Sequence, residues 1–174
     1  MTVLAKKTNP AAPKKSPNVI SGKAKPPIRP FRQSLPMQLM RARELVMQRF
    51  RPHLYAHGLT DQQWRIIRAL AEVKSLEIMA LGAKCCIHPA SLSRTLPKMD
   101  AAGILQRRTN EKDQRRMIIS LTAKGRRLFE RVSPESEPIY LGLTRDVGAA
   151  RLKEAYRVLD EIIEILSAPS TTSA

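Results

Sequence analysis

Cysteines and aromatic residues are scarce in this chain of 174 residues. Its two cysteines, Cys85 and Cys86, are adjacent and there is no Cys-x-x-Cys pair, which argues against a disulfide scaffold and a zinc ribbon. Only 4% of the residues are aromatic, which favours an aliphatic and mostly helical core. There is no run of about 18 apolar residues and no apolar secretory signal near the N-terminus. We therefore expect a reduced, cytoplasmic protein that does not enter a membrane.

Acidic residues are also few, 15 against 31 lysines and arginines, and the net charge is +16. A chain this basic, with a pI near 10.6, is expected to bind an anionic partner, and nucleic acid is the leading one. The basic residues concentrate in two regions, 1–34 and 84–131.

The first basic region, residues 1–34, is predicted to be disordered. It contains eight lysines and arginines, no acid and six of the thirteen prolines, so it cannot bury enough apolar surface to fold. It is either a solubilising leader or a mobile arm that contacts DNA phosphates. Residues 168–174 are predicted to form a second disordered tail, which leaves one folded domain over 35–167.

Hydrophobic periodicity predicts helices over most of this domain. A long helix is expected over 35–57, with a kink or an end at Pro52. A capping box at 60–63 opens a second helix that runs to residue 73, and Ser75 is expected to cap a third over 76–85. A fourth begins at His88-Pro89 and stops at Gly103.

The period then changes to that of a β-hairpin. Residues 104–108 and 116–121 are the expected strands, with a long basic tip between them. Thr122 is expected to cap the next helix, which Pro134 and Pro138 should break or restart, and a last amphipathic helix covers 148–166. This order predicts a mainly α fold with a small β-hairpin, a winged helix-turn-helix over 60–132.

The fourth helix carries a face suited to a DNA major groove. That face combines small hydroxyl side chains with cations and contains no acid, and such side chains bond base edges and phosphates. The alternative is an ordinary solvated helix surface. Pro97 should kink this helix or change its direction. The expected DNA-binding residues here are Pro89, Ser91, Ser93, Arg94, Thr95 and Lys98.

The hairpin tip forms the second part of the expected interface. The spacing of Asp113 and Arg115 lets the carboxylate pair with the guanidinium and direct it into a narrow minor groove. The alternative is a solvated charged turn with an incidental ion pair. The expected contacts are Arg107, Lys112, Asp113, Arg115 and Arg116.

Four stretches make the chain resemble the MarR family of winged helix-turn-helix regulators. They are residues 59–65, 91–99, 103–108 and 113–125, the last with the D-x-R and L-T-x-x-G pattern of the family's wing. The pattern around Arg43 and Phe50-Arg51-Pro52 is similar to the branch of homoprotocatechuate and aromatic-acid catabolism repressors.

This resemblance implies a homodimeric repressor that binds a palindromic operator of double-stranded DNA. Helices 35–58 and 148–167 would form the dimerisation region, and a small aromatic carboxylic acid would release the DNA. The effector residues to test are Arg43, His53, His57, Trp64 and Arg65. Alternatively, Trp64 is a core residue and both histidines are ordinary surface side chains, and a metal site at the histidine pair would lack a third ligand.

Two other functions compete with an acid-released repressor. Cys85 and Cys86 raise the alternative of a redox-sensing repressor, and the basic tail that of a non-specific architectural DNA-binding protein. An enzyme is not expected, because paired carboxylates, a phosphate-binding loop and a nucleophile with its base were not found. No cofactor and no metal are expected.

Overall fold

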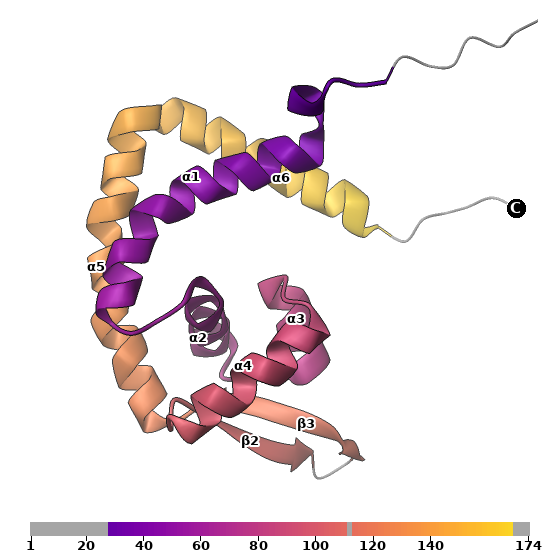
Figure 1. The fold of residues 1–174 in the computed structure, drawn as a ribbon, viewed down its shortest axis with the longest axis vertical. Helices are drawn as coiled ribbons and strands as arrows, with labels where there is room; N and C mark the ends of the chain where they lie inside the picture. Colours follow the sequence, from indigo (N-terminus) through magenta and orange to yellow (C-terminus); the bar gives the residue numbers. More distant parts are fainter. Residues whose placement is uncertain (1–27, 111–112, 169–174) are drawn as a thin grey trace, which may run out of the picture.

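The computed structural model describes residues 28–110 and 113–168 of the chain. The described residues form a C-shaped molecule, in which the long helix α5 joins two regions (Figure 1). One part, here the helical arm, consists of α1 and α6. The other, here the winged lobe, consists of α2 to β3. The elements are the 3-10 turn Phe31–Gln33, α1 Leu35–Ala56, α2 Asp61–Val73, β1 Ser75–Glu77, α3 Ile78–Cys85, α4 Pro89–Ala101, β2 Leu105–Asn110, β3 Asp113–Leu121, α5 Ala123–Val147 and α6 Ala149–Ser167.

Helix α2 is the central helix of the core. Its start is fixed by the predicted capping box, in which the Thr60 hydroxyl accepts from the Gln63 amide and the Gln63 side chain accepts from the Thr60 amide. Five of its side chains are buried, and α2 contacts α1, α3, α4, α5 and β3. The buried side chains are Trp64, Ile66, Ile67, Ala69 and Leu70.

The segment after α2 corrects one prediction. Ser75 does not cap a helix, because Ser75–Glu77 is a third strand that pairs antiparallel with β3, Leu76 opposite Ile119. The sheet order is β1-β3-β2, and α3 begins only at Ile78, after Glu77. Residues 75–77 form a strand because they pair with a segment about forty residues later in the chain. The local sequence pattern does not reveal this pairing.

The prolines interrupt the helices less than expected. Helix α1 continues past Pro52 to Ala56, and α4 continues past Pro97 to Ala101. Helix α5 runs through Pro134 and Pro138 without a break, so the predicted restart there is wrong. All four prolines are exposed, and the carbonyls that lose a partner can therefore be hydrated.

The ends of the chain lie mostly outside the described residues. Of the tail expected to be disordered, 1–27 are not described, whereas Phe31–Gln33 forms a 3-10 turn next to α1. Residues 169–174 are likewise not described. None of the described helices combines the length and the apolar character that a membrane span requires.

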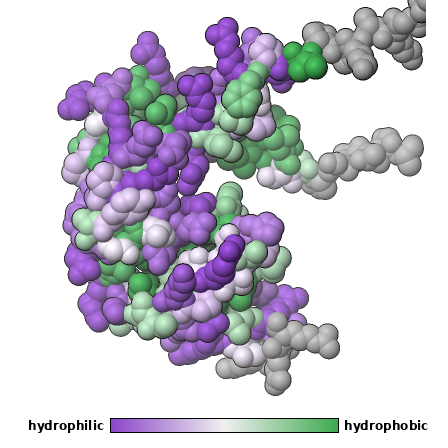
Figure 2. Space-filling model, in the orientation of Figure 1, coloured by the Kyte–Doolittle hydropathy of each residue, from purple (hydrophilic) through white to green (hydrophobic). Residues whose placement is uncertain are grey.

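The helical arm exposes large apolar side chains. Among the described residues, nothing buries a side chain of α6, and apolar side chains gather on the arm (Figure 2). Most come from the first half of α1 and from residues 156–166 of α6. The exposed side chains include Leu35, Leu39, Met40, Leu45, Tyr156, Ile163, Ile165 and Leu166.

A tight junction joins the wing to α5. The Thr122 hydroxyl donates to the Gly103 carbonyl (2.6 Å) and accepts from the Gly125 amide (3.1 Å). A Cβ at Gly125 would lie 2.0 Å from the Ile104 carbonyl oxygen. The L-T-x-x-G pattern is therefore a close contact between the start of α5 and the start of the wing.

We expect Gly125→Ala to lower the free energy of unfolding by at least about 2 kcal/mol, because backbone must move to relieve the clash. Gly142→Ala, also within α5, is the matched control. Its Cβ would meet no atom within 4 Å, so the change should be neutral or stabilising by up to about 1 kcal/mol. Urea unfolding measures both, and equal destabilisation of the two variants would contradict the junction's role.

Candidate nucleic-acid interface and basic cleft

Helix α4 presents the predicted polar face outward. His88 caps the helix through its Nδ1, which accepts from the Ala90 amide (3.3 Å), and Pro89 starts the first turn. The opposite face is buried in the lobe through Leu92, Leu96 and Met99. The outward face contains Ser93, Arg94 and Lys98, which are exposed, and Ser91 and Thr95, which are half-buried.

The side chains of this face mostly bond within the lobe. Arg94 lies along its own helix, with Nε donating to the Ala90 carbonyl (3.1 Å), and Ser93 donates to the same oxygen (3.0 Å). Thr95 contacts the Gln62 side chain of α2 at 3.5 Å. The Nε of Arg94 is thus engaged by its own helix.

Two arginines of the wing form ion pairs with carboxylates. Arg107 pairs with Asp100 at the end of α4 (2.7 Å). Arg116 pairs with Glu77 of β1 (3.2 Å) and with Asp113 (3.0 Å), and the hydrogen bond to Glu77 raises the pKa of its guanidinium. The pairs with Asp100 and Glu77 fasten the wing to α4 and to β1, a role that the sequence did not reveal.

The outermost part of the predicted wing interface lies outside the described residues. This holds for Lys112 and for the side chain of Arg115, and hence for the expected pair of Asp113 with Arg115. Arg108, by contrast, is described and exposed on β2.

A cleft of about 750 Å³ opens between α2, α3 and the two long helices α1 and α5. Four of its side chains are cationic and one is acidic, and an aromatic ring forms part of the wall. We call it the basic cleft. Its lining residues are Arg43, Arg65, Arg68, Ala69, Ala71, Glu72, Lys84, Cys85, Cys86 and Phe129.

The cations of the basic cleft have different partners. Lys84 pairs with Glu72 (3.0 Å), and Arg68 donates to the hydroxyl of Tyr140 on α5 (3.0 Å). Arg43 is half exposed and lies 3.9 Å from a carboxylate oxygen of Asp61. Each of these contacts joins two different helices. An anion in the cleft would therefore contact side chains that link one helix to another.

The structure brings together only part of the predicted effector set. Arg43 and Arg65 line the basic cleft, but Trp64 is buried behind it and stacks on Phe129, with 5.9 Å between ring centroids. His53 and His57 lie instead between α1 and α5, where they contact Ser136 (3.1 Å) and Glu135 (2.8 Å). Both histidines therefore fasten two helices.

Sequence reasoning missed Arg68, Lys84 and Tyr140. Arg65, Arg68 and Glu72 follow at i, i+3 and i+7 on α2, so the basic face of that helix was readable. The approach of Lys84 and Tyr140 depends on tertiary packing.

A model of the MarR family matches residues 57–116. The homoprotocatechuate degradative operon repressor of Escherichia coli is 36% identical over 132 residues, which are 76% of this chain and 89% of that protein. The chain belongs to the MarR family.

Two further relatives support this assignment. The regulator FarR of Neisseria gonorrhoeae is 36% identical over 132 residues, 76% of this chain and 90% of that protein. The crystal structure of NadR in complex with 4-hydroxyphenylacetate has a TM-score of 0.69 and 35% identity, and it covers 80% of this chain and 99% of NadR. This MarR-family protein is thus a DNA-binding transcriptional repressor and not an enzyme.

The two cysteines of this MarR-family protein differ in environment. Cys85 is buried, and burial raises the pKa of its thiol. Cys86 is exposed at the end of α3, in the left-handed conformation with φ 48°. Since the thiolate is the reactive form, Cys86 is the more accessible nucleophile of the pair.

Iodoacetamide at neutral pH is therefore expected to label Cys86 at least about tenfold faster than Cys85. The rates are measured separately by mass spectrometry, with Cys86→Ser leaving only Cys85 and Cys85→Ser leaving only Cys86. Equal rates would show that Cys85 is exposed in solution.

Proposed function

We propose that a homodimer of this protein represses transcription from a palindromic operator and leaves it when a small aromatic carboxylic acid occupies the basic cleft. The observation that carries the effector assignment is the cleft itself, which is lined by four cationic side chains, the carboxylate of Glu72 and the aromatic ring of Phe129.

The exposed apolar side chains of the helical arm support the dimer. Side chains such as Ile163, Ile165 and Leu166 are more than half exposed in the single chain. A contiguous apolar surface of this kind is typical of an interface between subunits. A second copy that covers α6 and the first half of α1 would leave both winged lobes free to meet DNA.

Helix α4 and the wing support operator binding. The outward face of α4 combines Arg94 and Lys98 with hydroxyl groups, and its apolar face anchors it in the lobe. In a dimer the two α4 helices would enter successive major grooves, about 34–36 Å apart, as in other helix-turn-helix proteins.

The chemistry of the basic cleft supports an aromatic carboxylate. A guanidinium binds a carboxylate through two parallel hydrogen bonds, and Phe129 offers a face for stacking. Arg68 and the hydroxyl of its partner Tyr140 would together orient the acid. NadR has been crystallised with 4-hydroxyphenylacetate, and that acid is the natural probe for this cleft.

A redox-sensing repressor is the second candidate function, and the exposure of Cys86 at the cleft favours it. Oxidation of this thiol would alter the segment just before α4. This alternative predicts that a hydroperoxide releases the DNA and that the acid does not. The release by hydroperoxide should be lost in Cys86→Ser.

Arg94→Ala is expected to weaken operator binding by about 1–3 kcal/mol and to relax the preference for one base pair, if Arg94 reads a guanine edge. The operator is a duplex selected by the wild-type protein from a random-sequence library, and binding is measured on its single-base variants. Arg131→Ala on α5 removes the same charge from an exposed site and is the control.

If all duplex variants lose affinity equally, Arg94 contacts only phosphates. If random DNA competes as well as the selected duplex at physiological salt, the protein binds DNA without sequence preference and the proposed operator recognition is wrong.

Arg68→Met is expected to weaken the binding of 4-hydroxyphenylacetate at least about tenfold, because a charge-assisted hydrogen bond contributes more than 1.4 kcal/mol. Isothermal titration measures the affinity. Arg127→Met removes the same charge from an exposed site on α5 outside the cleft lining, and its affinity should equal that of the wild type. Equal affinities of all three proteins would place the acid elsewhere.

A further inference from the structure

The orientation of α4 depends on the short turn that precedes it. The amides of Cys86 and Ile87 close the end of α3 by donating to the carbonyls of Ala83 (3.1 Å) and Gly82 (2.9 Å). Cys86 adopts a left-handed conformation that a residue with a side chain rarely takes, Ile87 is buried and His88 caps α4. This turn is therefore the direct link between the end of α3 and the start of α4.

Arg65 holds this turn from the side of α2. Its Nη1 donates to the carbonyl of Cys85 (2.6 Å) and to that of Cys86 (3.3 Å). The last carbonyls of a helix lack partners within the helix, so a guanidinium is well suited to satisfy them. The Cys85 thiol lies 3.5 Å from the Arg65 carbonyl and adds a second contact between α2 and the turn.

The same guanidinium belongs to the wall of the basic cleft. Among the described residues, no acceptor reaches the Nε of Arg65, although this atom is buried. An unpaired buried donor is costly, and two uncharged carbonyls are weaker partners than a carboxylate. A carboxylate in the cleft would therefore bind the Arg65 guanidinium more strongly than the carbonyls of Cys85 and Cys86 do.

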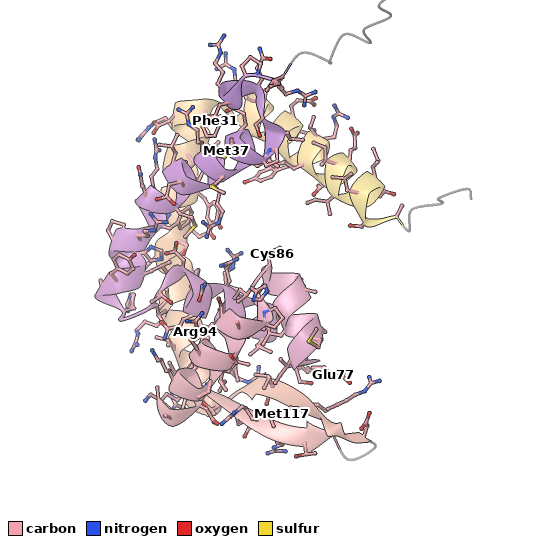
Figure 3. All side chains as sticks on the ribbon, turned by 45° about the vertical axis from the view of Figure 1, so that its right-hand side comes forward. Phe31, Met37, Glu77, Cys86, Arg94 and Met117 are labelled. Atoms are coloured by element: carbon pink, nitrogen blue, oxygen red, sulfur yellow. The ribbon has the colours of Figure 1, made fainter. Side chains whose placement is uncertain are left out.

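The turn has room to respond. A second hollow of about 400 Å³, almost entirely apolar, lies on its other side between α3 and the start of α4. Cys86 lines both hollows, and it sits at the edge of the winged lobe that faces the helical arm (Figure 3). The turn thus has open space on both sides into which its backbone can move.

We propose that Arg65 is the positioning residue that couples the two sites. A carboxylate in the basic cleft draws its guanidinium away from the carbonyls of Cys85 and Cys86, the turn loosens, and α4 leaves its DNA-binding position. This inference rests on the proposed acid effector and adds to it the route by which the acid acts.

Amide hydrogen exchange over residues 82–92, measured with and without saturating 4-hydroxyphenylacetate, tests the coupling. In the wild type the acid should speed exchange at Cys86 and Ile87 at least about threefold, because local opening becomes easier. In Arg65→Met, exchange should be fast without the acid and unchanged by it, while the acid still binds through Arg68 and Lys84.

Two variants separate coupling from binding and from folding. Arg68 lines the same cleft but contacts Tyr140 and not the turn. In Arg68→Met, saturating acid should therefore still speed amide exchange at Cys86 and Ile87 as in the wild type. Arg65→Lys keeps the charge without the forked donors, and a response between those of the wild type and Arg65→Met is expected even if Arg65→Met unfolds.

The outcomes are distinct for the two proposals. If titration shows that the wild type does not bind the acid, the proposed effector is wrong and the coupling role falls with it. If the acid binds but the turn does not respond, or if the turn of Arg65→Met or Arg65→Lys responds as strongly as in the wild type, the role of Arg65 alone is overturned.

Discussion

The packing of α2 is the constraint on which both candidate sites depend. Its apolar face, from Trp64 to Leu70, is buried against the other helices of the lobe and against α5. Its basic face, with Arg65 and Arg68, is thereby directed to the cleft. Burial of large apolar side chains supplies the free energy that keeps these cations near one another, since their mutual repulsion opposes it. The helix that builds the core thus also builds the cleft.

This arrangement places the proposed effector site within a few residues of the proposed DNA-binding helix, with no residue in common. The basic cleft ends at the Cys85 and Cys86 carbonyls, and α4 begins at Pro89. A ligand need only favour one position of the turn to change the affinity for DNA, and coupling of about 1–3 kcal/mol is typical of such systems. The same geometry explains how an exposed thiol at Cys86 would offer a second input to the same turn.

Local signals predicted much of the fold, and tertiary contacts decided the rest. The capping box at Thr60 and the helix cap at Thr122 were readable, because each involves residues three apart. The contacts of Thr122 and Gly125 with Gly103 and Ile104 were not, because they join segments about twenty residues apart. The strand at Ser75–Glu77 was not, because its partner lies in β3. His53 and His57 share a helix face as expected, but that face meets α5 and leaves the cleft to Arg68 and Lys84. Which side of a helix meets a ligand depends on its neighbours.

The most direct test of the account is a reciprocal titration of the operator and the acid on the same protein. Fluorescence anisotropy of a labelled duplex, selected by the wild-type protein, gives the affinity for DNA with and without 4-hydroxyphenylacetate. Isothermal titration gives the affinity for the acid with and without the duplex. Each ligand should weaken the binding of the other by the same factor, about 5- to 150-fold. A duplex that stays fully bound at acid concentrations that saturate the free protein would contradict it.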